Sequence, residues 1–430
     1  MSTPPRVPTT HIKNGRVIDP KNGIDRPLDL FLAAGRILAV DEPGRIPPGF
    51  VAECTLDAQG LAVIPGLVDL SSRLGRDMET ELRAALAGGV THLLCPPDTD
   101  PLLDDPALVE RLVRHSQNLG LAQVLPMGAL TQGLAGEKLA QLHKLHRAGC
   151  IAFSHAQRPL VDSAVLLRAF QYAATFDCPV HWQAQDGYLA QQGVAHDGEV
   201  ATRLGLVGIP VCAETVALST ALQLAQVSGV RLHITRISSA AGIALVRAAQ
   251  AGGLAVTCDV GIHHLHCSEQ DIAYFDPQAR FIPPLRSVED RAALRAAVAE
   301  GLAVLCSDHT PLSADGKQLP FTEALPGATA LELLLPLTLQ WANENQLPLT
   351  TALARISCDP ARILGIAAGA LTPGMSADLA LVDLEQRWCV SAESLLSRGK
   401  NTLFLGRELR GRVRTTLRRG AVVFTAQAET

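Results

Sequence analysis

The sequence is poor in aromatic residues and in charge. Aromatic residues make up 4% of the chain, charged residues 18%, and the formal net charge is only −5. A small net charge on 430 residues gives no reason to expect binding to nucleic acid or to an anionic membrane surface. No uncharged apolar stretch approaches the roughly 18 residues that a membrane span needs. Hydrophobic residues, at 47%, are enough for a sizeable core, which argues against disorder.

The ten cysteines lack the spacing of a metal-binding or redox motif. No two of them form a Cys-x-x-Cys pair, and most lie in apolar runs, as small buried side chains do. We therefore expect reduced thiols in a cytoplasmic protein. The first residues, Met-Ser-Thr-Pro-Pro-Arg-Val-Pro, contain no apolar core of a secretion signal, which agrees with that location. The chain also lacks a Gly-x-Ser-x-Gly elbow, a phosphate-binding loop and a dinucleotide fingerprint.

The middle of the chain alternates between short apolar runs and helical stretches rich in Ala and Leu. Eight such strand-then-helix units predict a closed parallel (β/α)8 barrel of the TIM type. We expect its strands at Val63–Leu67, Val90–Leu94, Gln123–Met127, Cys150–Phe153, Val180–Trp182, Arg231–Thr235, Ala255–Val260 and Ala303–Cys306.

Both ends of the chain have a different sequence pattern, which indicates short strands separated by turns. Asn14-Gly15 is a hairpin signal, residues 29–40 read as a second hairpin, and Arg419-Gly420 reads as a turn. The two ends therefore predict one small composite β-sandwich domain flanking the barrel. The expected boundaries are 1–62 and 367–430 for the two parts of this domain and 63–366 for the barrel.

Several short segments, in a fixed order along the barrel pattern, carry a family resemblance. Each is weak alone, and together they resemble dihydroorotase of the cyclic-amidohydrolase branch of the amidohydrolase superfamily. The resemblance runs from Ile12 to Phe424. The segments are Ile64-Pro65-Gly66-Leu67-Val68-Asp69, Ala87-Gly88-Gly89-Val90-Thr91, Arg231-Leu232-His233-Ile234, His263-His264-Leu265, Pro283-Pro284-Leu285-Arg286, Ser307-Asp308-His309-Thr310-Pro311, Asp359-Pro360-Ala361 and Gly374-Met375-Ser376-Ala377-Asp378-Leu379.

The resemblance implies a zinc site, yet this sequence has lost most of its ligands. In the family, zinc lowers the pKa of bound water and polarises the substrate carbonyl, and a carboxylate serves as general base. The family's first His-x-His falls on Ser71 and Arg73, and the Asp-Asp motif falls on the segment Ala152-Phe153-Ser154-His155-Ala156-Gln157. Later ligand histidines fall on Gln183 and Arg236. Among the ligand positions only Asp308 is retained, so the resemblance implies a vestigial site without zinc or any other cofactor.

The positions that contact substrate in the family are changed as well. The arginine that binds the substrate carboxylate is replaced by Gly75, and the two asparagines are replaced by Asp98 and Ile282. An acidic side chain at position 98 would repel an anionic substrate such as dihydroorotate.

Other histidines could rebuild a metal site, but simpler interpretations compete. His181 lies two positions before Gln183 and could replace its lost ligand. Alternatively, Arg73 or Arg236 could pair with Asp308 and fill the vacated site with an ion pair. The remaining histidines are expected to be structural: His263 and His264 orient a loop, His233 is a core residue, and His309 caps a strand end. His155 and His266 are further spare candidates for ligands.

The resemblance implies a catalytically inactive dihydroorotase homologue, a pseudoenzyme of pyrimidine biosynthesis. Noncatalytic chains of this kind associate with the catalytic chain of bacterial aspartate carbamoyltransferase and hold its trimers in a larger assembly. We therefore expect that partner, with this chain as a homodimer within the hetero-oligomer. One alternative is an active cyclic amidohydrolase with a rebuilt or mononuclear metal site. A weaker one is a sensor that binds a nucleotide or pathway intermediate in the barrel mouth.

Overall fold

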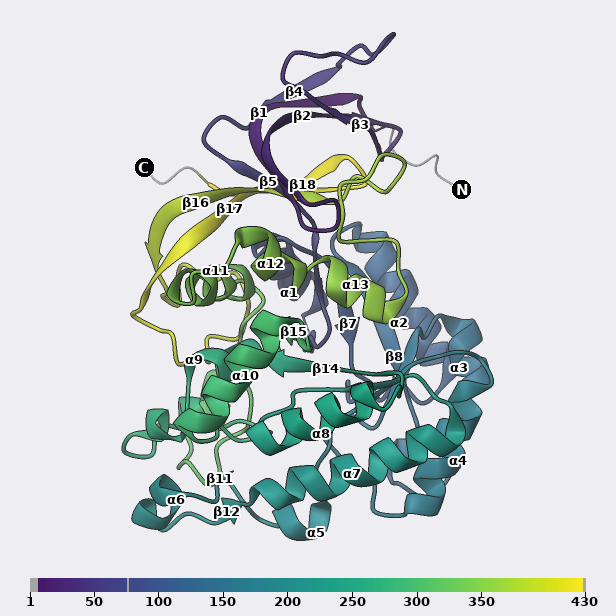
Figure 1. The fold of residues 1–430 in the computed structure, drawn as a ribbon, viewed down its shortest axis with the longest axis vertical. Helices are drawn as coiled ribbons and strands as arrows, with labels where there is room; N and C mark the ends of the chain where they lie inside the picture. The colour runs from purple at the N-terminus through teal and green to yellow at the C-terminus, as the bar shows by residue number, and fades with distance from the viewer. Residues whose placement is uncertain (1–6, 76, 428–430) are drawn as a thin grey trace.

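A computed structural model describes residues 7–75 and 77–427 and contains two large sheets. One is an all-parallel sheet of eight strands in the order β15-β14-β13-β10-β9-β8-β7-β6, ringed by helices (Figure 1). This is the predicted (β/α)8 barrel. Its strands are β6 (Leu67–Asp69), β7 (Val90–Cys95), β8 (Gln123–Ala129), β9 (Ala152–Ser154), β10 (Val180–Trp182), β13 (Leu232–Ile234), β14 (Val256–Gly261) and β15 (Ala303–Cys306).

The barrel is closed by the chain segments that follow its first and last strands. A parallel bridge joins Ser72 to His309, with His309 N donating to Ser71 O at 3.1 Å and Arg73 N donating to His309 O at 2.9 Å. The Asp69 carboxylate reinforces the seam, because it accepts hydrogen bonds from the backbone N–H (2.7 Å) and hydroxyl (2.6 Å) of Ser307. The closure brings side by side two segments, around Ser71–Arg73 and Asp308–His309, that the sequence resemblance aligns with ligand motifs.

Capping side chains begin several of the outer helices. Asp105, Asp162 and Ser287 accept backbone N–H bonds at the N-termini of the helices that follow them, as N-cap residues do. The helices that follow the barrel strands are α1 (Met78–Ala87), α2 (Pro106–Leu119), α3 (Leu142–Ala148), α4 (Ser163–Ala174), α7 (Val211–Ser228), α8 (Ala240–Ala251), α10 (Val288–Glu300) and α11 (Leu334–Glu344). An excursion after β10 contains α5 (Gly187–Ala190), β11 (Ala195–His196), α6 (Glu199–Leu204) and β12 (Gly208–Ile209). Shorter helices are α9 (Ile262–His266), α12 (Leu349–Ala354) and α13 (Cys358–Leu364).

The second sheet is built from both ends of the chain, as predicted. Its order is β18-β17-β16-β5-β1-β2-β3, with β4 paired to β1, and it forms the β-sandwich domain above the barrel in Figure 1. Strands from the two termini meet where β16 pairs with β5. The strands are β1 (Thr10–Asp19), β2 (Ile24–Ala33), β3 (Arg36–Asp41), β4 (Cys54–Asp57), β5 (Ala62–Pro65), β16 (Leu379–Cys389), β17 (Glu408–Arg418) and β18 (Ala421–Thr425).

Two local predictions were wrong. Asn14-Gly15 is no hairpin turn but a bulge within β1, where Asn14 has a φ of 63° and the register with β2 shifts. The run expected as the first barrel strand is divided at Gly66: Ala62–Pro65 joins the terminal sheet and Leu67–Asp69 joins the barrel. A Cβ at Gly66 would lie 2.3 Å from Thr91 Oγ1, so the close approach of the two strands requires glycine there. The hairpin within 29–40 and the turn at Arg419-Gly420 are confirmed.

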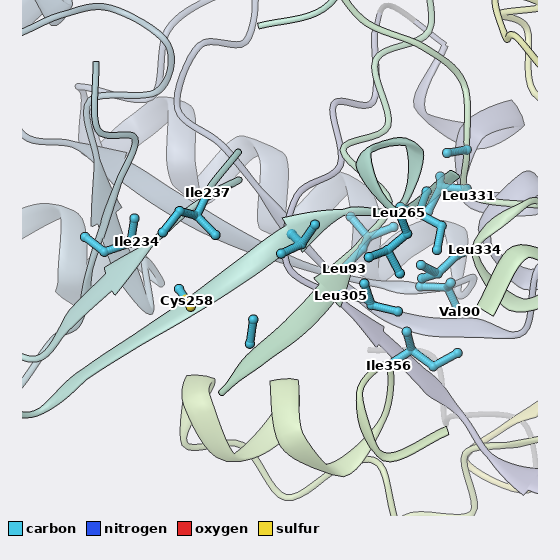
Figure 2. Close-up of a cluster of buried hydrophobic side chains, with 14 of the residues drawn as sticks. Val90, Leu93, Ile234, Ile237, Cys258, Leu265, Leu305, Leu331, Leu334 and Ile356 are labelled. Atoms are coloured by element: carbon cyan, nitrogen blue, oxygen red, sulfur yellow. The ribbon is translucent and has the colours of Figure 1, made fainter. Parts of the chain in front are cut away.

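The main core lies between the barrel strands and the helices around them. Figure 2 shows Val90 and Leu93 of β7, Leu305 of β15 and the sulfur of Cys258 among buried side chains from the surrounding segments. The strands β7 and β15 are buried on both faces, as is usual for strands of a parallel sheet. Within the described ranges, none of the helices has the length and apolar character needed to cross a bilayer.

Candidate functional site

A buried ion pair lies at the C-terminal ends of the barrel strands, where barrel enzymes carry their active sites. Arg236, which follows β13, places Nη1 at 2.7 Å from Oδ1 of Asp308, which follows β15. Its other terminal nitrogen, Nη2, donates to Oε1 of Gln183, which follows β10. Three of the positions singled out in the sequence therefore form one hydrogen-bonded unit, and the predicted ion pair at Asp308 is confirmed.

Because both side chains of this pair are buried, each stabilises the charge of the other. The side chains of Arg236 and Asp308 are 4% and 5% exposed. Burial alone would lower the pKa of Arg236, but the charge and hydrogen bond of Asp308 raise it above its ordinary value. Both residues also have left-handed backbone, with φ of 53° and 47°, and Asp259 Oδ1 accepts the Arg236 N–H at 2.6 Å. Such backbone is uncommon for a residue as large as arginine.

Arg73 extends the network to the other side of Asp308. Its Nη2 lies 2.8 Å and its Nε 3.1 Å from Asp98 Oδ2, and its Nη1 lies 3.8 Å from Asp308 Oδ1. Ser71 is in reach of the same carboxylate oxygen at 3.5 Å. Asp308 thus faces two guanidinium groups, and Asp98, at a former substrate position, neutralises one of them.

His181 is inside the barrel but does not join the network. Both of its ring nitrogens are buried without a hydrogen-bond partner among the described residues, and its ring lies 4.5 Å from that of His233. Burial and then the neighbouring His233 lower the pKa of His181 well below its usual value, so the ring is held neutral. His233 contacts Thr257 Oγ1 at 2.8 Å and Asp259 Oδ2 at 2.9 Å, which confirms that it is a satisfied core histidine.

The remaining histidines have structural surroundings. His264 Nε2 contacts Pro283 O at 3.2 Å, as predicted for a loop-orienting residue, whereas His263 packs between Phe281 and Phe404 with Nε2 unpartnered. His309 does more than cap a strand end. Its Nδ1 accepts the Ala330 N–H at 3.1 Å, so Nε2 carries the proton and donates it to Glu81 at 3.0 Å. His155 contacts Thr131 at 2.9 Å, and His266 contacts Leu337 O at 3.0 Å.

Sequence reasoning missed the buried carboxylates that support the site. Asp259 is hydrogen-bonded to His233 and to the Arg236 N–H. Asp69 accepts hydrogen bonds from Ser307. Glu214 accepts hydrogen bonds from the backbone N–H and hydroxyl groups of Ser238 and Ser239. Desolvation raises the pKa of Asp69, although the Ser307 hydrogen bonds oppose that shift. The available signal was an acidic residue within or at the end of an otherwise apolar strand, as in Leu67-Val68-Asp69 and Cys258-Asp259.

Two of the three positions that the resemblance assigns to substrate binding, Gly75 and Ile282, lack a polar side chain. Gly75 lines a cavity of about 570 Å³ beside α2, together with Leu74, Met78 and Leu108. Ile282 contributes its backbone carbonyl to Gln157 at 3.4 Å. Neither position supplies a charged group that could hold a substrate carboxylate.

The donor set at the barrel mouth does not fit zinc. Zinc needs thiolate, imidazole or carboxylate donors, and a permanently protonated guanidinium cannot be a ligand. Asp308 is the one carboxylate retained from the family's set, and its Oδ1 faces both arginines. Elsewhere in residues 7–75 and 77–427, no three His, Cys, Asp or Glu side chains are arranged to hold a metal ion.

The fold and the strand-end site define a barrel of the amidohydrolase class. The sequence model of the family described as "Dihydro-orotase-like" matches residues 60–241. A "Dihydroorotase-like protein" of Pseudomonas aeruginosa is 46% identical over 417 residues, covering 95% of this chain and 98% of that protein. A "Dihydroorotase" of Geobacter sp. (strain M21) is 37% identical, covering 96% and 99%. The chain therefore belongs to the dihydroorotase-like family of amidohydrolases.

Solved structures agree with the fold. The L-hydantoinase (dihydropyrimidinase) from Arthrobacter aurescens superposes with a TM-score of 0.85 at 25% identity, covering 97% of this chain and 96% of that one. A D-hydantoinase structure gives a TM-score of 0.79 at 23% identity, covering 97% and 95%.

Proposed function

We propose that this chain is a catalytically inactive dihydroorotase homologue that serves as a structural subunit of aspartate carbamoyltransferase in pyrimidine biosynthesis. The observation that supports inactivity is the Arg236–Asp308 pair, with Gln183 as its third member. A guanidinium occupies the place in which the family's chemistry requires a cation bound by imidazole and carboxylate.

The charge balance of the network supports the same proposal. Each of the two carboxylates, Asp308 and Asp98, has an arginine within 2.8 Å, so the site needs no metal to neutralise it. Ser71 is a poor replacement nucleophile, because its hydroxyl reaches the Asp308 carboxylate only at 3.5 Å and that carboxylate is already paired with Arg236.

Names among the relatives are divided in a way that fits this proposal. The proteins from Pseudomonas aeruginosa and Pseudomonas putida, at 46% and 44% identity, are called "Dihydroorotase-like protein". More distant relatives, at 36–38% identity, are called "Dihydroorotase". The proposed task is to hold transferase trimers together in the cytoplasm, with this chain as a homodimer.

Reconstitution with the transferase tests the proposal. The purified chain is mixed with the transferase catalytic chain of the same organism at micromolar concentration and analysed by size-exclusion chromatography with light scattering. We expect a hetero-oligomer larger than either component, higher transferase activity than without this chain, and no turnover of dihydroorotate. An unrelated barrel protein of similar mass serves as the control. Separate elution of the two chains would contradict the assembly role.

The second candidate is an active cyclic amidohydrolase with a rebuilt or mononuclear metal site. It is favoured by one observation, the two unpartnered ring nitrogens of the neutral His181 inside the barrel. In that case the protein purified without chelators would carry about one zinc per chain, and His181→Asn and Asp308→Asn would each remove it. Absence of zinc from the wild-type protein would eliminate this candidate.

A further inference from the structure

Two cations from different loops, Arg280 and Lys317, lie close together, and neither is hydrogen-bonded to the Arg236–Asp308 network. Arg280 follows a short 3-10 helix, η3 (Pro277–Ala279), in the loop after β14. Lys317 ends another, η4 (Ala314–Lys317), in the loop after β15. Lys317 Nζ donates to Pro277 O at 2.9 Å and to Arg280 O at 3.2 Å, which fastens the loops together.

Arg280 differs from the other deeply buried arginines in having no strong acceptor. Arg236 pairs with Asp308 at 2.7 Å, and Arg286 donates to Ile209 O at 2.7 Å. Arg280 is only 8% exposed, yet within the described residues its guanidinium makes one hydrogen bond, a 3.4 Å contact from Nη1 to Phe281 O, and its Nε has no partner. No carboxylate of the described chain lies within ion-pair distance of it. A buried guanidinium in this condition is costly unless an anion compensates it.

Lys317 also lacks a carboxylate at ion-pair distance among the described residues. It is 5% exposed, and its ammonium lies 6.0 Å from the centre of the Phe281 ring. Burial, followed by the charge of Arg280, lowers the pKa of Lys317 to about 7, while burial lowers that of Arg280 to about 10. Asp276 opposes the shift of Lys317, but its carboxylate caps the backbone N–H of Gln278 at 2.9 Å and makes no ion pair with Nζ. Among the described residues, neither the Arg280 guanidinium nor the Lys317 amine has a close counter-charge, which a bound anion would supply.

We propose that Arg280 and Lys317 form a binding site for a small oxyanion, with a doubly charged tetrahedral group such as phosphate as the best match. The guanidinium offers its unpartnered Nε–H and the ammonium offers its third N–H, since two of its donors are held by carbonyls. A dianion balances both charges, whereas a carboxylate balances one. This site is independent of the proposed assembly role and of the former metal site.

Isothermal titration of the chain alone with inorganic phosphate, at constant ionic strength, tests the site. We expect one phosphate per chain, weaker binding of acetate, and at least about tenfold weaker phosphate binding in Arg280→Met, the usual loss for a hydrogen bond to a charged group. Arg168→Met is the matched control, because Arg168 is an exposed arginine on α4 whose Nε contacts Ala164 O, and it should bind phosphate as the wild type does.

Thermal unfolding separates ligand binding from a structural role. Because the Arg280 guanidinium makes only one weak hydrogen bond to the described residues, Arg280→Met should keep or raise the Tm in phosphate-free buffer and lose only the rise in Tm that phosphate produces. Arg280→Lys, which keeps the charge, should retain part of that rise. Absence of phosphate binding at 20 mM, equal binding of acetate and phosphate, or unchanged phosphate binding in Arg280→Met would each overturn the proposal.

Discussion

Arg236 and Asp308 form a 2.7 Å ion pair at the C-terminal ends of two barrel strands, with both side chains almost entirely buried. The pair joins segments 72 residues apart in the sequence, and Gln183 completes it from a third strand. Under the function proposed above, the Arg236 guanidinium stands where the family resemblance implies a metal. The consequences of this buried pair can be measured.

Removal of the arginine alone should destabilise the fold strongly. Arg236→Met leaves the Asp308 carboxylate buried with Arg73 at 3.8 Å as its nearest cation, and an uncompensated buried charge costs about 3–5 kcal/mol. Urea unfolding measures the free energy. The matched control is Arg231→Met, which breaks a 2.8 Å pair with Asp177 in which both side chains are well exposed and should cost about 1 kcal/mol or less. Equal losses for the two variants would contradict a central role for the buried pair.

Neutralising both partners should cost less than removing one. In Arg236→Met combined with Asp308→Asn, no unpaired charge remains at the site, so we expect a smaller loss of unfolding free energy than in Arg236→Met alone. The double-mutant cycle should show a coupling energy of about 1 kcal/mol or more between these contacting residues. Additive effects would mean that the two side chains do not stabilise each other.

The barrel could be predicted from the sequence because its signal is repeated. Apolar strand runs alternate with helical stretches along the middle of the chain, so a misplaced boundary such as the one at Gly66 does not change the architecture. The Asn14-Gly15 signal failed because the flanking strand pairs on both sides, with β2 and with β4 or β5, and this pairing favours a bulge over a turn.

From the sequence, the ion pair at Asp308 was predictable only as one of two pairings, with Arg73 or with Arg236. The buried carboxylate that supports it, Asp259, was not predictable. Ser71, Arg73, Gln183, Arg236 and Asp308 could be found because they stand at motif positions. Arg236, and not Arg73, is the closer partner of Asp308. This depends on the left-handed backbone at Arg236 and Asp308 and on Asp259, which accepts the Arg236 N–H. Arg280 and Lys317 lie in loops without a motif, and their lack of counter-charges is a tertiary property.

Acid should destabilise the protein through its buried histidines. Burial lowers the pKa of His263 to about 3, and that of His92 and His266 to about 4. Below the usual value near 6.5, the unfolded chain therefore binds protons that the folded chain does not, and stability falls as the pH falls. For His263 the loss at pH 5 is about 2 kcal/mol.

Replacement of His263 by an apolar residue tests this pH dependence. His263→Leu keeps contact with Phe281 and Phe404 and should make the urea midpoint fall less steeply between pH 7.5 and pH 5. The exposed His115→Leu is the control and should retain the wild-type slope. A slope in His263→Leu that matches the wild type would show that His263 is not among the groups responsible.

Zinc content is the most direct test of whether Arg236 stands in place of a metal. The protein is purified without chelators, dialysed against excess zinc, separated from free metal and analysed by inductively coupled plasma mass spectrometry, with Asp308→Asn alongside. We expect far less than one zinc per chain in the wild type and the same content in Asp308→Asn. About one zinc per chain in the wild type, lost in Asp308→Asn, would contradict that expectation.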